Sequence, residues 1–336
     1  MIDEIPALSF TGTVDRALVH RAAVAEVFVT DSAQLSGNQF LVAAQLPRVH
    51  GYYSDHVTSP AAYDPLLLLE VFRQAGIQAT HRYMNAPLRS SYIFDGCDLR
   101  IHSHSALGIG ALPGEVLMRG TIIEEKTRKG VLCGGLMEID ATIGGRPVAS
   151  VLFDFRWIPS ETWRALRSRM RSTLQQEASR AYHTDRRLAP AVVGRRSTEN
   201  VVLADATVHG REVHAQVVVD QAHPALFDHP LDHIPGAVIF ESLRQTSLYT
   251  AHELFGLSPR GLAVSRCRTT FSRIGEFELP TDCRAVVLGS STPNQLDLEL
   301  SLTQEGDEIA SADISLVTTR PLIGYPVPAA EAAALV

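Results

Sequence analysis

Two stretches of this chain are apolar on nearly every side and keep a single stripe of polar residues. They run from Leu66 to His81 and from Ala237 to His252. At about 100° per residue, the polar positions of each stretch fall on one face of an α-helix. A helix that is apolar everywhere except one stripe is typical of a protein core. The pattern therefore predicts two buried helices, each with one polar face.

The two polar stripes have the same composition and spacing. They consist of Glu70, Arg73, Gln74 and His81 in the first stretch, and of Glu241, Arg244, Gln245 and His252 in the second. One shift of 171 residues superposes all four positions. The repetition predicts one fold written twice, and a carboxylate and a guanidinium on a buried helix indicate a purpose beyond packing.

Around each helix, runs of alternating or continuous apolar residues predict strands. The expected strands are Ala25–Thr30, Gln39–Leu46, Gly114–Glu125, Val131–Thr142 and Pro147–Trp157 in the first half, and Asn200–Ala204, His214–Asp220, Cys283–Gly289, Gln295–Gln304 and Glu308–Thr318 in the second. Turn residues at Gly144-Gly145 and Glu305-Gly306-Asp307 predict hairpins between the last two strands of each set. A long helix followed by an antiparallel meander is typical of the α+β class.

Between the halves, residues 160–196 contain apolar positions at helical spacing among four arginines. We expect an amphipathic connecting helix and a polar loop there, which places the domains at 1–159 and 197–322, with a tail at 323–336. The basic face of this helix is either a solvated surface or a docking surface for an acidic partner such as an acyl carrier protein.

Composition limits the class of protein. The 336 residues are 45% hydrophobic, which is enough for two packed cores, and the net charge of −7 gives no footprint for nucleic acid or an anionic membrane. The four cysteines lack metal-ligand spacing, so we expect reduced thiols in a cytoplasmic protein. No HExxH motif and no GxGxxG after a strand is present, so no metal or cofactor is expected.

The segment before the second helix resembles a catalytic loop. Residues 227–236 read FDHPLDHIPG, and Glu241 follows. This is similar to the hot-dog dehydratases, which place a His-x-Pro loop before Pro-Gly and an acid on the central helix. In that family the histidine lies 14 residues before the acid; His56 and Glu70 keep this spacing, whereas His229 lies 12 residues before Glu241.

A resemblance over nearly the whole chain is more specific. Its blocks are residues 19–21 (VHR), 26–31 (EVFVTD), 46–50 (LPRVH), 69–74 (LEVFRQ) and 228–233 (DHPLDH). In this order they resemble the A-factor biosynthesis (AfsA) family. The resemblance implies two tandem hot-dog domains, each an antiparallel sheet wrapped around a central helix, forming an intramolecular pseudo-dimer.

The same resemblance implies an activity. Members transfer a β-ketoacyl group from acyl carrier protein to the hydroxyl of dihydroxyacetone phosphate, on the way to butenolide precursors of γ-butyrolactone autoregulators. Two alternatives remain open, a dehydratase or thioesterase of the same fold and a non-catalytic acyl-binding protein. The acyl chain, the number of active clefts and the choice between monomer and homodimer stay open.

The repeated stripe supplies groups that such a transfer needs. Burial raises the pKa of a glutamate and a nearby arginine lowers it, so we expect Glu241 to be a base poised near neutrality. Arg244 would contact phosphate or balance the charge of Glu241, and Gln245 would orient the acid or the acyl chain. Glu70, Arg73 and Gln74 are the first-half counterparts. The alternative is a structural ion pair at i, i+3 on each helix.

The helix entrances differ between the halves. Asp64-Pro65 opens the first helix with a capping carboxylate, whereas Pro235-Gly236 opens the second without one. The N–H groups near Gly236 would then bind a thioester oxygen. His56, His229 and His233 are candidates for proton transfer, with His56 expected opposite Glu241 and His229 opposite Glu70. His81 and His252 are expected to be structural.

Overall fold

The computed structural model describes residues 6–319 apart from 36, 175–185, 291 and 293. The tail expected at 323–336 lies outside the described residues. The chain divides into two compact units. Unit 1 takes its residues from Met1–Ser54, Ala62–Ser179 and Gln221–Asp232, and unit 2 from Asp55–Ala61, Arg180–Asp220 and His233–Val336. Each unit thus includes one loop from the other half of the sequence.

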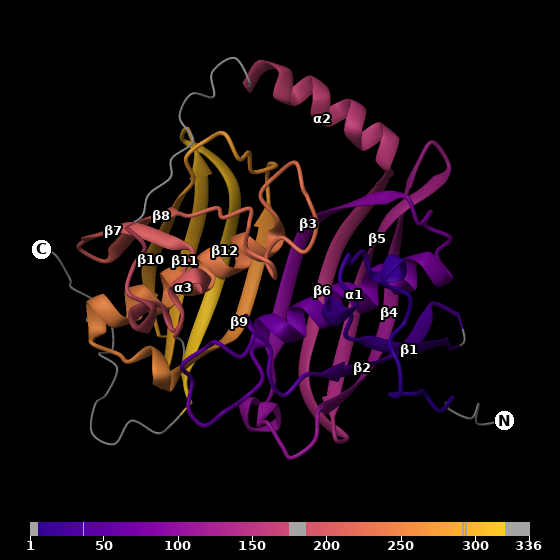
Figure 1. The fold of residues 1–336 in the computed structure, drawn as a ribbon, viewed down its shortest axis with the longest axis horizontal. Coiled ribbons are helices and arrows are strands. Elements are labelled where there is room, and N and C mark those ends of the chain that lie inside the picture. Colours follow the sequence, from indigo (N-terminus) through magenta and orange to yellow (C-terminus); the bar gives the residue numbers. More distant parts are fainter. Residues whose placement is uncertain (1–5, 36, 175–185, 291, 293, 320–336) are drawn as a thin grey trace, which may run out of the picture. The chain divides into compact units, whose positions relative to one another are not determined.

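Unit 1 is an antiparallel sheet with one long helix, α1 (Pro65–Tyr83) (Figure 1). Its strands are β1 (Val29–Gln34), β2 (Gln39–Leu46), β3 (Ser90–Ile101), β4 (Gly114–Arg128), β5 (Val131–Ile143) and β6 (Arg146–Pro159), in the spatial order β1-β2-β4-β5-β6-β3. Three short 3-10 helices are η1 (Arg16–Val19), η2 (Val24–Glu26) and η3 (His104–Leu107). A further helix, α2 (Ser160–Leu174), follows β6.

Unit 2 repeats this arrangement around α3 (Gly236–Phe255). Its strands are β7 (Leu203–His209), β8 (Glu212–Val217), β9 (Leu262–Phe271), β10 (Asp282–Gly289), β11 (Gln295–Gln304) and β12 (Asp307–Thr318), in the order β9-β12-β11-β10-β8-β7. The 3-10 helices are η4 (Pro190–Val193), η5 (Thr198–Asn200) and η6 (Pro259–Gly261).

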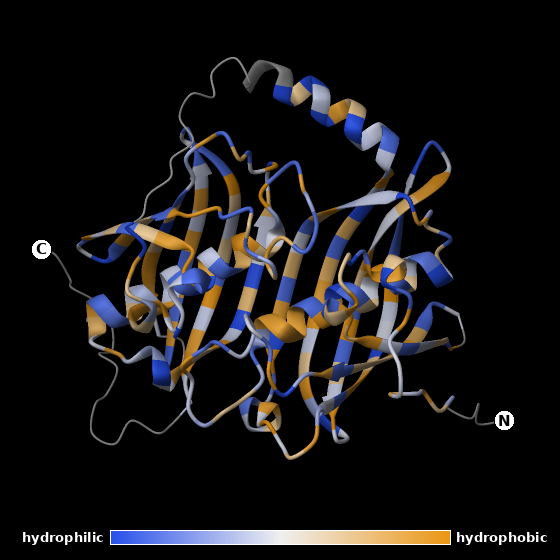
Figure 2. Ribbon diagram, in the orientation of Figure 1, coloured by the Kyte–Doolittle hydropathy of each residue, from blue (hydrophilic) through white to orange (hydrophobic). Residues whose placement is uncertain are grey.

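The core of each unit lies between its long helix and its sheet, where apolar residues dominate (Figure 2). In unit 1, Gly76 of α1 lies so close to the sheet that an added Cβ would be in van der Waals contact with Met137 and Phe153. The ring of Phe40 covers Gly120 on the neighbouring strand, where no side chain would fit. Close packing of this kind specifies which helix face is buried.

The structure confirms the two buried helices, the α+β class and both hairpins. Gly144 and Gly145 adopt φ values of 56° and 74°, and Glu305 and Gly306 adopt 52° and 86°. Two consecutive left-handed residues match the right-handed twist of the flanking strands. All four cysteines lie in the described part of the chain, and none forms a disulfide.

Two details of the strand prediction are wrong. The first strand of each half begins later than expected, because residues 24–26 and 198–200 form 3-10 turns. The side chain of Gln74 takes the place of a neighbouring strand there, since its amide bonds both Phe28 N and Glu26 O. Strands β3 and β9 were not predicted; bulges interrupt their pairing with β6 and β12, which breaks the alternation that identifies a strand.

The connecting helix is present as α2, whose apolar and charged residues alternate at helical spacing (Figure 2). The polar loop expected after it falls mostly on residues 175–185, outside the described part. Among the described residues, no helix combines the length and the apolar character that crossing a bilayer would need.

Candidate functional site

The polar stripe of unit 2 is a buried network centred on the carboxylate of Glu241. Arg244, one turn along α3, donates from Nη2 to Oε2 at 2.9 Å, and Gln245 donates to Oε1. A second guanidinium, that of Arg195, donates from Nε to Oε1 at 3.0 Å. The side chain of Glu241 is fully buried. One carboxylate therefore holds two arginines.

Gln245 connects this network to the segment that precedes β7. Its Oε1 accepts the N–H of Val202 at 3.0 Å, and its Nε2 donates to the carbonyl of Asn200 at 2.7 Å. We call residues 190–202 the strap of unit 2 and residues 16–28 the strap of unit 1. The helix stripe fixes the strap, and the strap returns Arg195 to Glu241.

Unit 1 contains the same network. Arg73 donates from Nε to Oε2 of Glu70 at 2.8 Å, and Arg21 of the strap donates from Nε to Oε1 at 3.0 Å. Gln74 donates to the same carboxylate at 2.6 Å and bonds Phe28 N and Glu26 O as described above. The structure thus repeats every contact of the stripe, including the strap.

Sequence reasoning missed Arg21 and Arg195. Glu70 and Glu241 are 171 residues apart, whereas Arg21 and Arg195 are 174 apart, so the single shift that aligns the helices misaligns the straps. The signal that could have found them is a second comparison of the straps alone. With a shift of 174, η1 falls on η4 and η2 falls on η5.

The second arginine changes the protonation of each glutamate. Burial acts to raise the pKa of Glu241, but Arg195 and Arg244 outweigh it and lower that pKa to about 2. Burial and the pair Arg21 and Arg73 likewise bring the pKa of Glu70 to about 2. The expectation of a base poised near neutrality is therefore wrong, because it counted one arginine where there are two. Both carboxylates are ionised at neutral pH.

Each network has a histidine from the loop that its unit receives from the other half of the sequence. In unit 1, Asp228 accepts the N–H groups of Ala22 and Ala23 at 2.6 and 3.0 Å, and His229 follows it. In unit 2, Asp55 accepts the N–H of Ser197 at 3.2 Å, and His56 follows.

The histidines are thus distributed as the sequence suggested. His56 pairs with Arg195 in an isolated β-bridge, in the unit that contains Glu241. His229 lies in the unit that contains Glu70, beside Asp228. His233 belongs to unit 2 and lies three residues before Gly236. One helix acid and one loop histidine therefore occur in each unit.

The helix entrances differ as their sequences predict. Asp64 caps α1 by accepting the N–H of Leu66 at 2.9 Å, and Pro65 has no N–H to offer a ligand. The first residue of α3 is Gly236, which is exposed, and no side chain caps this end. The positive end of the helix dipole at Gly236 therefore stays accessible to an anionic or polarised oxygen.

The two networks also differ in exposure. Arg73 is 24% exposed, whereas its counterpart Arg244 is 7% exposed. His20 in the strap of unit 1 lies 3.0 Å from His81, Nε2 to Nε2. Burial, followed by the charges of His81, Arg73 and His229, lowers the pKa of His20 to about 3.

Unit 2 has no counterpart of this imidazole, because Gly194 occupies the position of His20. A Cβ added to Gly194 would lie 2.7 Å from the side chain of Leu248, so an apolar group fills the space there. His81 and His252 each reach a backbone carbonyl five residues on, those of Ala86 and Leu257. This contact closes the end of each helix.

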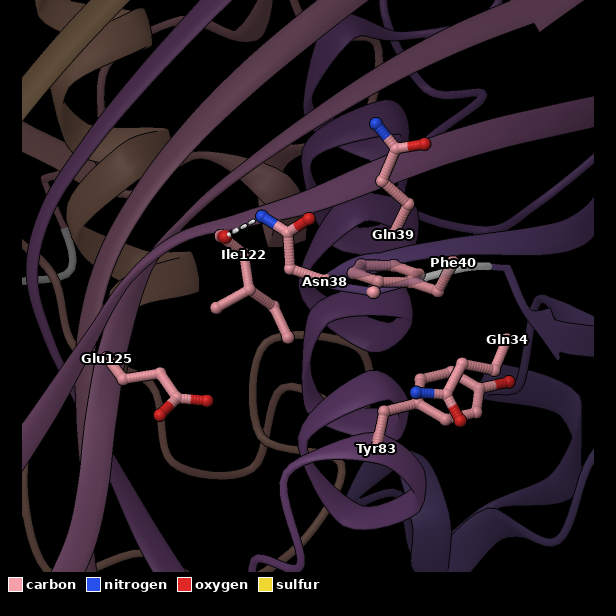
Figure 3. Close-up of a pocket in the computed structure, with 8 residues that line it drawn as sticks. Gln34, Asn38, Gln39, Phe40, Tyr83, Ile122 and Glu125 are labelled. Carbon is pink, nitrogen blue, oxygen red and sulfur yellow. Dashed lines mark hydrogen bonds between the residues drawn. The ribbon is translucent and has the colours of Figure 1, made fainter.

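A pocket of about 230 Å³ opens elsewhere in unit 1 (Figure 3). It is lined by Gln34, Gly37, Asn38, Gln39, Phe40, Tyr83, Ile122 and Glu125. Inside it, Asn38 donates to the carbonyl of Ile122 at 2.6 Å (Figure 3). None of the predicted site residues lines this pocket. Tyr83 ends α1, roughly 20 Å from Glu70 at 1.5 Å per residue.

Comparison with known proteins identifies relatives over the whole chain. The family model described as AfsA, the A-factor biosynthesis hotdog domain, matches residues 3–159 and again residues 175–320. A protein of Streptomyces virginiae named 2-oxo-3-(phosphooxy)propyl 3-oxoalkanoate synthase is 32% identical over 313 residues, which cover 92% of this chain and 98% of that protein. A protein of the same name from Streptomyces griseus subsp. griseus is 28% identical, covering 94% and 96%.

Among solved structures, a putative oleoyl thioesterase from Lactobacillus plantarum has a TM-score of 0.52 at 11% identity, covering 84% of this chain and 97% of that one. A likeness at this identity concerns the fold alone. The two matches of a hotdog-domain model, together with the repeated helix and sheet, confirm the tandem hot-dog architecture.

Proposed function

Because the chain belongs to the AfsA family of A-factor biosynthesis hotdog-domain proteins, we propose that it transfers a β-ketoacyl group from an acyl carrier protein thioester to the hydroxyl of dihydroxyacetone phosphate. The observation that carries the proposal is the printed name of the relatives, which describes the product as the 2-oxo-3-(phosphooxy)propyl ester of a 3-oxoalkanoate. Such an ester consists of a β-keto acid and that phosphorylated triose. It is a precursor of a phosphorylated butenolide.

The chemistry needs three functions from the protein. The hydroxyl oxygen of the triose attacks the thioester carbonyl while a base accepts the hydroxyl proton. Donors then stabilise the tetrahedral oxyanion, and the C–S bond breaks as the thiol leaves with a proton. The triose phosphate carries negative charge that a cation must hold. The described residues offer groups for each function.

Unit 2 is our choice for the thioester. The accessible N–H groups at Gly236 would bind the thioester oxygen as charge develops on it, and Gly permits close approach. Glu241 lies five residues further along the same helix. Pro65 removes the equivalent N–H from unit 1. We therefore assign no thioester to α1.

His56 is our choice for the proton acceptor in unit 2. The low pKa of Glu241 makes its carboxylate a weak base, so its part is to hold Arg195 and Arg244 in place. The β-bridge between His56 and Arg195 ties the loop to this network. Arg244 would balance developing charge or contact the substrate, and Gln245 would fix the strap beside them.

Unit 1 keeps the network of Glu70 and Gln74 but offers cations more openly. Arg73 is partly exposed while bonded to Glu70, and His229 is half-buried beside Asp228. A guanidinium and an imidazole in such positions suit a phosphate oxygen. We assign to this unit the binding of an anionic group, with Glu70 holding Arg73 in place.

The experiment is mass spectrometry of the products formed from a panel of β-ketoacyl thioesters, each offered with and without dihydroxyacetone phosphate. The proposal expects thioester loss that depends on the triose phosphate, with a phosphorylated ester or butenolide as product. Loss in water alone would replace it with a thioesterase, and loss of water from a hydroxyacyl thioester with a dehydratase. Binding without turnover, unchanged in Glu241→Gln, would indicate a non-catalytic acyl-binding protein.

A further inference from the structure

Helix α2 has one buried face and one exposed face. Trp163 and Arg167 are buried against unit 1, and the guanidinium of Arg167 lies 5.8 Å from the centre of the Trp163 ring. The opposite face carries Arg164, Leu166, Arg169 and Met170, all exposed; we call these four residues the outer face of α2. Leu166 is 44% exposed and Met170 42%.

The buried face of α2 holds the loop that leads to α3. Arg167 donates from Nη2 to the carbonyl of Asp232 at 2.6 Å, and Arg171 donates from Nη1 to the same oxygen at 3.2 Å. Arg167 also approaches the Asp232 carboxylate at 3.3 Å. Asp232 lies three residues after His229 and four before Gly236. The position of α2 is therefore linked to the loop that carries both candidate site elements.

The outer face combines a basic rim with an apolar centre. Leu166 and Met170 are one turn apart, and Arg164 and Arg169 flank them. Glu161, at the start of the helix, is the sole acidic residue of α2. A few apolar side chains surrounded by arginines are typical of a protein interface, and an unbranched methionine adapts to different partners.

We propose that the outer face of α2 is the docking surface for an acidic acyl carrier protein that delivers the β-ketoacyl group; this rests on the proposed function. The chain as a whole carries a net charge of −7, so an acidic protein is repelled by most of its surface. A local basic face then decides where such a partner lands. Docking there places the carrier on the helix that anchors Asp232.

The test compares two donors of the same acyl group in the double variant Arg164→Glu/Arg169→Glu. One donor is the β-ketoacyl carrier protein, and the other is the N-acetylcysteamine thioester, which has no protein surface. We expect KM for the carrier protein to rise about tenfold or more, because reversing two charges removes the steering. The kcat with either donor and the KM for the small thioester stay as in the unmodified protein.

Two further variants sharpen the comparison. Arg128→Glu/Arg146→Glu makes the same change in net charge at exposed arginines on the hairpins of unit 1 and should leave KM for the carrier protein unchanged. Leu166→Ser/Met170→Ser removes the apolar centre without changing charge and should also raise KM for the carrier protein. Thermal melting verifies that each variant is folded.

Three outcomes would overturn the proposal. They are an unchanged KM for the carrier protein in both outer-face variants, an equal loss with the small thioester, and a change of oligomeric state in analytical ultracentrifugation, which would make the face a contact between copies of this chain. Binding of the carrier protein, measured by calorimetry without turnover, separates failure of docking from failure of the proposed function. A protein that binds the carrier through α2 yet never forms ester would keep the docking surface and lose the activity.

Discussion

Arg195 donates a hydrogen bond from Nε to Oε1 of Glu241 at 3.0 Å, and both side chains are fully buried although 46 residues separate them. Arg21 makes the same bond to Glu70 in unit 1, across 49 residues. A polar stripe on a buried helix is thus completed by a strap from an earlier part of the chain. The pair fixes the strap to the helix, and with it the loop that carries the neighbouring histidine.

Replacing Arg195 with methionine should strongly destabilise unit 2. The change leaves Glu241 buried with one arginine in place of two, and breaking a buried ion pair costs about 3 kcal/mol. We expect a clear fall in the urea midpoint of unfolding. Arg273→Met is the matched control, because Arg273 and Asp307 form an exposed pair that contributes less than about 1 kcal/mol. Equal midpoints for the two variants would contradict the buried network.

Acid should destabilise the protein through Glu70 and Glu241. The pKa of each carboxyl is lowered to about 2 in the folded state, against a model value of 4.5. A lowered folded pKa contributes stability that is complete above about pH 4.5 and is lost as the pH falls towards 2. Each group then contributes about 3 kcal/mol.

The measurement is the urea midpoint at pH 6 and pH 3 for the unmodified protein and for Glu241→Gln. The variant cannot lose a proton at this position, so its midpoint should fall less with acid. If the difference between the two proteins is the same at both pH values, the pKa of Glu241 is not depressed by its arginines.

Gly236→Pro should reduce turnover and keep the fold. Proline is tolerated at the first helical position, where its missing N–H has no partner within the helix. Losing one oxyanion donor should lower kcat by about 10². Asp64→Asn, which keeps the cap of α1, should have little effect. Normal turnover in Gly236→Pro, together with inactivity after a bulky replacement of Asp64, would move the thioester to unit 1.

His56→Asn should lower kcat by about 10² or more, because the asparagine cannot accept a proton from the acceptor hydroxyl. His229→Asn is the matched variant, since His229 occupies the same place in the other network. We expect it to raise KM for dihydroxyacetone phosphate and to leave kcat largely intact. Steady-state kinetics with both substrates varied distinguish these results. A reversed pattern would exchange the roles of the two units.

The sequence was sufficient for the elements that follow a single period. The stripe of Glu70, Arg73 and Gln74 repeats at helical spacing, and the Gly144-Gly145 turn has no other conformational use, so the helices and hairpins could be predicted. The family resemblance rested on several blocks in the same order. Each of these signals lies within a short window of residues.

The parts that could not be predicted depend on distant contacts. Arg21 reaches Glu70 across 49 residues, and an offset of three between strap and helix hides its repeat. The pKa of Glu241 depends on that second arginine, so the sign of its shift was beyond a local argument. Likewise, nothing near β3 or β9 in the sequence announces a bulge.

The most direct measurement is a single-turnover reaction of the β-ketoacyl carrier protein with dihydroxyacetone phosphate labelled with ¹³C in all three carbons, followed by mass spectrometry. The account predicts that the acyl group leaves the carrier in an ester or butenolide that retains the label and the phosphate, at a rate that falls in Gly236→Pro. Release of an unlabelled free acid at the same rate with or without the triose would contradict it.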